Sequence, residues 1–135
     1  MARVQLTDSW SIDLDDSFAA RLVDDDLQFV SAGPPPRSVW LAIWSPPEEL
    51  TPDEVVEMIR GDLHPAPVAA FDERGPDDRP RLASWYPETV EGRTHWGLYG
   101  YSLGNGAFVQ SAFLAPDETH LPWALAAWRS VHDDA

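Results

Sequence analysis

The stretch THWGLYGYSLGNGAFVQSAFL, residues 94–114, decides the fold. Its two halves, 94–103 and 106–114, are rich in aromatic and apolar residues and are typical of strands. Gly104-Asn105 between them predicts a two-residue hairpin connection, of the kind that tolerates positive φ. We therefore expect an antiparallel pair, with Leu82–Tyr86 as a third strand beside it.

The first third of the chain predicts three more strands. Trp10–Leu14 alternates apolar and polar residues, which indicates a half-buried strand. Residues 27–30 predict a second strand, and residues 39–44, apolar on both faces, predict a central strand that is covered on both sides. Residues 15–26 are expected to form a polar connection with a short helical turn inside it.

Two helices are expected. Thr51-Pro-Asp-Glu54 has the residues of a capping box and predicts a helix over 52–60. A second amphipathic helix is expected over 115–132. Residues 62–81, rich in Pro and Asp, are expected to form a long loop.

These elements define one domain, residues 1–135, of the α+β class. The expected architecture is a single antiparallel sheet of about six strands whose one face is covered by both helices. The expected order is ββ-β-α-βββ-α.

At this point the chain resembles the PsbP-like α/β sandwich. That group includes the photosystem II extrinsic protein, the Ran guanine-nucleotide release factor and bacterial chaperone-like relatives. The resemblance rests on the element order, on WSIDL (10–14), on SVWLAIW (38–44) ahead of a capped helix, and on the closing hairpin and helix with Trp128. It implies a non-catalytic protein that binds other proteins. No local motif fixes an alignment, so no binding residue is carried over.

The composition excludes several classes of protein. The formal net charge is −14, from 23 acidic and 9 basic residues, and the chain has no Cys. Nucleic-acid duplexes and anionic membranes attract the opposite charge, so neither is an expected partner. Without Cys there is no disulfide, thiolate nucleophile or thiolate-bound zinc. The first ten residues lack the apolar run of a signal peptide, so we expect a cytoplasmic protein; the Arg, Ala and Pro usage suggests a GC-rich, bacterial genome.

Acidic residues are concentrated around the first connection. Asp13, Asp15 and Asp16 lie around its start, and three more, Asp24, Asp25 and Asp26, lie at its end. The spacing is not that of a calcium loop. Two interpretations stay open, a solvated turn that protects strand edges and an acidic docking face for a basic protein.

No catalytic or metal-binding motif is present. The four histidines lack the i, i+4 spacing of a helical metal site, and no Ser lies in a Gly-x-Ser-x-Gly elbow. We expect no enzyme activity and no cofactor.

The aromatic residues supply the remaining candidates. Five tryptophans are expected in the core, namely Trp40, Trp44, Trp85, Trp96 and Trp128. Trp10 and Trp123, near element ends, could be partly exposed and are candidate interface anchors, although the core is the better prediction for any single tryptophan. The uncovered sheet face is expected to carry Tyr86, Tyr99 and Tyr101.

The leading hypothesis is a non-catalytic, acidic protein-binding module. It acts either as an immunity-type inhibitor with acidic loops or as an escort chaperone that holds an apolar segment against the sheet. The alternative is a small-ligand or enzymatic pocket formed by the aromatic sheet face and the 62–81 loop. Mimicry of nucleic acid by the acidic side chains is a third hypothesis.

Overall fold

The computed structural model describes residues 2–23, 26–75 and 77–134. The described elements follow one another in the order β1 (Ala2–Gln5), β2 (Trp10–Leu14), β3 (Ala19–Val23), β4 (Asp26–Ser31), β5 (Arg37–Trp44), α1 (Pro52–Asp62), β6 (Ala69–Arg74), β7 (Pro80–Val90), β8 (Arg93–Leu103), β9 (Phe108–Ala115), the 3₁₀ turn η1 (Glu118–His120), α2 (Leu121–Ser130) and β10 (His132–Asp133).

The described strands form two sheets, both fully antiparallel. The large sheet has seven strands in the order β3-β4-β5-β9-β8-β7-β6, and the small one has three in the order β1-β2-β10. The α+β class expected from the sequence is confirmed, with a second, smaller sheet in addition.

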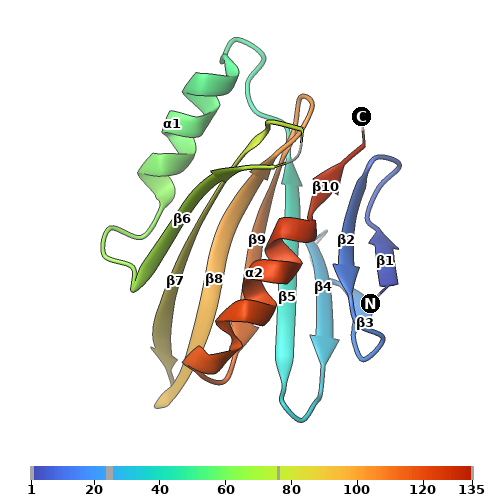
Figure 1. Ribbon diagram of the computed structural model, residues 1–135, viewed down its shortest axis with the longest axis vertical. Coiled ribbons are helices and arrows are strands. Elements are labelled where there is room, and N and C mark those ends of the chain that lie inside the picture. Colours follow the sequence, from blue (N-terminus) through green and yellow to red (C-terminus); the bar gives the residue numbers. More distant parts are fainter. Residues whose placement is uncertain (1, 24–25, 76, 135) are drawn as a thin grey trace.

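The two helices pack on opposite faces of the large sheet. Helix α2 and the small sheet cover one face, where Trp128, Phe113 and Ile12 are fully buried in the main core (Figure 1). Helix α1 buries Val55 and Ile59 against Leu82 and Phe108 on the other face. The expectation that both helices cover one face is therefore wrong. An apolar stripe in the sequence shows that a helix packs on a sheet, but it does not show on which face. That face depends on the path of the connections before and after the helix.

Helix α1 begins as the sequence predicts. The Thr51 hydroxyl accepts a hydrogen bond from the Glu54 amide at 3.2 Å, and the Glu54 carboxylate accepts one from the Thr51 amide at 3.1 Å. This reciprocal cap satisfies two backbone donors that the first turn leaves free. The helix runs to Asp62, two residues beyond the expected end.

Two expected connections contain strands. Residues 19–23 of the expected polar connection form β3, and residues 69–74 of the expected long loop form β6. Both are edge strands, paired on one side only. Their sequences lack the long apolar runs of the central strands, and pairing with β4 and β7 supplies the backbone hydrogen bonds that determine them.

The hairpin between β8 and β9 is longer than expected. Leu103 pairs with Phe108, so four residues connect the strands, and the positive φ lies at Gly106. The Gly104 amide donates to the Ala107 carbonyl at 2.8 Å and closes the loop.

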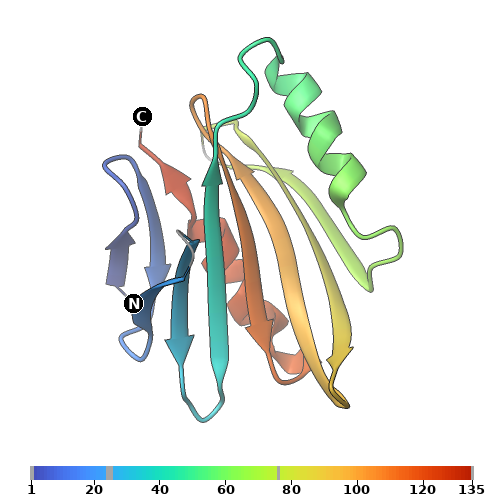
Figure 2. The ribbon, with the colours of Figure 1, turned by 180° about the vertical axis from the view of Figure 1, so that it is seen from behind.

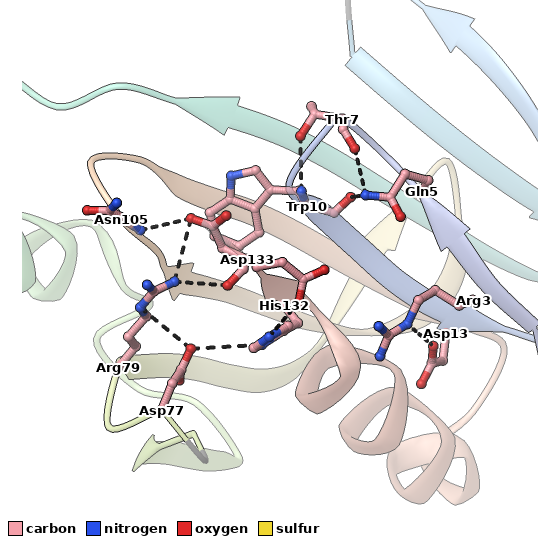
Figure 3. A network of polar contacts seen from close by, with 11 residues as sticks. Arg3, Gln5, Thr7, Trp10, Asp13, Asp77, Arg79, Asn105, His132 and Asp133 are labelled. Carbon is pink, nitrogen blue, oxygen red and sulfur yellow. Dashed lines mark hydrogen bonds and ion pairs between the residues drawn. The ribbon is translucent and has the colours of Figure 1, made fainter.

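Polar contacts at this end of the molecule hold the C-terminal strand in place (Figure 3). The Asp133 side chain, 2% exposed, accepts a hydrogen bond from the Asn105 amide at 2.8 Å and lies 3.6 Å from the Arg79 guanidinium. Trp10 lies beside Asp133, and a Cβ on Gly104 would collide with both side chains. These contacts therefore connect β10 of the small sheet to the β8–β9 hairpin.

Candidate binding site on the open sheet face

The face of the large sheet opposite α2 is uncovered over much of β5, β9 and β8, and we term it the open face (Figure 2). The strand register places Trp40 on β5 opposite Ala112 on β9, and Ala112 opposite Tyr99 on β8. Neighbouring strands are about 4.8 Å apart, so Trp40 and Tyr99 are separated by about 10 Å at the backbone. The small side chain of Ala112 leaves a floor between them.

A hollow of about 390 Å³ lies over this floor. Tyr99, Tyr101 and Trp40 line it from the sheet, and the segment just after α1 contributes His64. Helix α1 covers the neighbouring part of the same face, so its C-terminal end forms one wall. The hollow has the size of a pocket for a small ligand or for one or two side chains of a partner.

A row of rings forms part of the wall. The His64 and Tyr86 rings are 4.2 Å apart between centroids, and Tyr86 stacks on Tyr99 at 4.8 Å with 22° between the planes. Tyr99 can fold down onto the strand because Gly97 has no side chain. A Cβ at Gly97 would lie 2.5 Å from Cε2 of Tyr99.

Gln110 fixes the other side of the hollow. Its Oε1 accepts a hydrogen bond from Nε1 of Trp44 at 3.1 Å, and its Nε2 donates to the Tyr101 hydroxyl at 3.4 Å. One amide thus connects side chains of β5, β9 and β8 and holds the Tyr101 ring at the rim.

All three tyrosines of the chain belong to this site, and each has a raised pKa. Burial is the first cause, because it disfavours the phenolate. The Glu88 carboxylate adds to the shift at Tyr86 and Tyr99, and the Asp62 carboxylate raises the pKa of Tyr101 further. At neutral pH the three side chains are therefore uncharged phenols.

The structure places the described acidic residues of the first connection at its two ends. Asp15 and Asp16 lie in the turn before β3, where Asp15 accepts hydrogen bonds from the Ser17 amide and hydroxyl. Those bonds hold the pKa of Asp15 below its ordinary value. Asp26 begins β4 and pairs with Val23 at the far end of β3, a strand whose five residues span about 17 Å, and it lines the hollow. Asp24 and Asp25 lie outside the described residues.

Asp13, another member of that group, is on β2, 3.7 Å from the Arg3 guanidinium of β1. Among the described members, Asp15 and Asp26 stand at opposite ends of β3. Whether this group forms a docking face stays a prediction.

The two candidate tryptophan anchors lie elsewhere in the molecule. Trp10 is 3% exposed within the core, so it is not an exposed interface anchor. Trp123 is half-buried, stacks on Phe18 at 6.0 Å between centroids and carries the Arg37 guanidinium 4.6 Å above its ring. It packs on the face covered by α2, so it is not part of the hollow.

Two tryptophans expected in the core belong to the open face. Trp40 is half-buried in the wall of the hollow, and Trp44 is 52% exposed. The apolar run 39–44 suggested cover on both sides, but the structure covers only one. Aligning Trp40, Ala112 and Tyr99 across the strands would have predicted the hollow, and that register is not readable from the sequence of a single strand.

Neither a metal cluster nor a membrane-spanning helix is found in the described part of the chain. Among these residues no three His, Cys, Asp or Glu side chains are placed to hold one metal ion. None of the described helices is long and apolar enough to cross a bilayer.

Comparison with known proteins defines the fold and no more. No protein-family model matches the sequence, and no curated protein is significantly similar to it. Among solved structures, LpqN from Mycobacterium tuberculosis matches with a TM-score of 0.50 and 14% identity, over 97% of this chain and 86% of LpqN. LpqN is described as involved in cell envelope biogenesis. At this level of identity the match establishes a shared fold.

Proposed function

We propose that this chain is a non-catalytic binding module of PsbP-like fold, and that it holds an apolar segment of another protein on its open face. The observation that carries the proposal is the assembly of Tyr99, Tyr101 and Trp40 around a small-residue floor on an uncovered sheet face. Tyrosine and tryptophan supply large contact areas with little loss of side-chain freedom, and they are enriched in protein interfaces.

Of the two versions considered from the sequence, the distribution of charges supports the escort type. The inhibitor type needs clustered carboxylates for electrostatic capture. Asp13, Asp15 and Asp26 are instead spread over different elements, and Asp13 is close to an arginine. We propose no catalytic role for the chain, and we keep the cytoplasm as its proposed compartment.

Site-specific photo-cross-linking tests the proposal. A photoreactive phenylalanine analogue replaces Trp44, an exposed aromatic residue of the open face beside the lining residue Gln110, in the organism that encodes the chain. The matched control replaces Ala126, an exposed residue of α2 on the other side of the sheet. We expect one defined protein adduct from position 44 that is absent from position 126. Identical adducts from both positions, or none from position 44, would refute the proposal.

A second candidate function is the binding of a small molecule in the hollow. Its volume of about 390 Å³ favours this alternative, as does the presence of Gln110 and Ser84 among the lining residues. Native mass spectrometry of the chain purified from its own host distinguishes the two. A bound mass of a few hundred daltons supports the small ligand, whereas a protein-sized mass supports the leading proposal.

A further inference from the structure

The charges that line the hollow are of one sign. Asp26 and Asp62 are its acidic lining residues, and no arginine lines it among the residues that the structure describes. Neither carboxylate forms an ion pair with another described residue. The Nδ1 atom of His64 accepts a hydrogen bond from the Ala66 amide at 3.1 Å.

The end of α1 adds to the negative potential. The helix ends at Asp62, and Leu63, its C-cap, lines the hollow. Unpaired carbonyls give a helix C-terminus a partial negative charge, which favours a cation placed next to it. Arg60, the basic residue of this last turn, is engaged elsewhere, 2.7 Å from the Asp72 carboxylate.

Aromatic faces supply a third source of attraction. Tyr99, Tyr101 and Trp40 line the same space. Their ring faces carry the negative part of the aromatic quadrupole, and cations bind there most strongly when water is partly excluded. The raised pKa of Tyr99 and Tyr101 keeps both phenols uncharged at neutral pH.

From these three features we infer that the hollow binds an organic cation, an ammonium or guanidinium group. The group belongs either to a Lys or Arg side chain of the bound segment or to a free organic cation. This inference rests on the proposed function, because it assigns the chemistry of the group that enters the same site. A neutral apolar group would use the rings and leave Asp26 and Asp62 without a partner.

The test compares probes of equal shape and different charge by isothermal titration calorimetry on the full chain. Choline is paired with its neutral isostere 3,3-dimethylbutan-1-ol, and a capped Leu/Ala peptide with one Arg is paired with the same peptide carrying citrulline. We expect the cationic member to bind about tenfold more tightly in at least one pair. Preference for choline alone indicates a free ligand, and preference for the Arg peptide indicates a protein segment. Equal affinities in both pairs, or no binding of any probe, overturn the inference.

Two matched variants show whether the local charge is responsible. Asp62→Asn and Asp16→Asn each remove one negative charge, but only Asp62 lines the hollow. We expect Asp62→Asn to weaken binding of the preferred cation at least threefold and Asp16→Asn to leave it unchanged. If the two variants change the affinity for the cation equally, the cation does not bind next to Asp62 and the inference is overturned. Trp40→Leu should also weaken binding of the cation and leave binding of its neutral isostere unchanged.

The inference and the proposed function can fail separately. If position 44 gives a protein adduct but charged and neutral probes bind alike, the binding module stands and the cation site is wrong. If choline binds selectively through Asp62 but position 44 gives no adduct, the cation site stands and the protein-binding module is wrong.

Discussion

The substitution Gly97→Ala tests how the wall of the hollow is built. A Cβ at this position would lie 2.5 Å from Cε2 and 2.7 Å from Cζ of Tyr99, and 2.9 Å from Cδ2 of Leu114. The Tyr99 ring must therefore move off the strand. Overpacking of this kind costs about 1–3 kcal/mol, and the lower backbone entropy of alanine returns about 0.5–1 kcal/mol. We expect a net destabilisation of about 1–2 kcal/mol in urea unfolding followed by tryptophan fluorescence.

A double-mutant cycle identifies the source of this cost. In a Tyr99→Ala background the ring is absent, and Gly97→Ala should become neutral or stabilise the fold by up to about 1 kcal/mol. The Leu114 methyl ends a flexible side chain and can move. The same destabilisation in both backgrounds would refute the placement of Tyr99 over Gly97.

Three further predictions concern the tyrosines of the site, the Glu73 ion pairs and the start of α1. All three tyrosines should titrate above pH 10 when the folded protein is followed by ultraviolet absorbance. The free energy of unfolding should fall as pH rises beyond 10, because the tyrosines of the unfolded chain ionise first. A titration midpoint at pH 10 in the folded protein would contradict the burial of the three phenols. Hydrogen bonds from Arg129 and then Arg81 lower the pKa of Glu73, so its stabilisation is present above its ordinary value near 4.5 and is lost as pH falls through the lower folded pKa. Glu73→Gln should remove up to about 1 kcal/mol at pH 7 and flatten that acid decline, and an unchanged decline would exclude Glu73 as its source. Thr51→Ala should cost about 1 kcal/mol in urea unfolding through loss of the cap to Glu54, whereas no loss would show that the capping box is dispensable.

Local signals in the sequence predicted the elements that local interactions determine. The cap at Thr51 and Glu54 specifies the start of α1 through bonds within one turn. Period-two alternation places Tyr99 and Tyr101 on one face of β8, and the structure puts both on the open face. Their role in binding stays a prediction.

Long-range pairing determined the features that the sequence did not predict. The edge strand β6 exists because residues 69–74 pair with β7, and nothing within them demands a strand. Trp40 faces the hollow because of the path of the chain and the side on which α1 docks. Asp15 and Asp26 belong to one acidic stretch of the sequence but are separated in space by the length of β3. Each of these features depends on residues far away in the chain.

Filling the hollow tests the central claim most directly. Ala112→Trp places a large ring on the floor between Trp40 and Tyr99, in a space of about 390 Å³, at a half-buried position. Binding of the partner captured through position 44 is then measured with this variant and with Ala126→Trp on the opposite side. The account predicts that Ala112→Trp abolishes binding while Ala126→Trp keeps it, with both proteins folded. Full binding by the Ala112→Trp protein would contradict it.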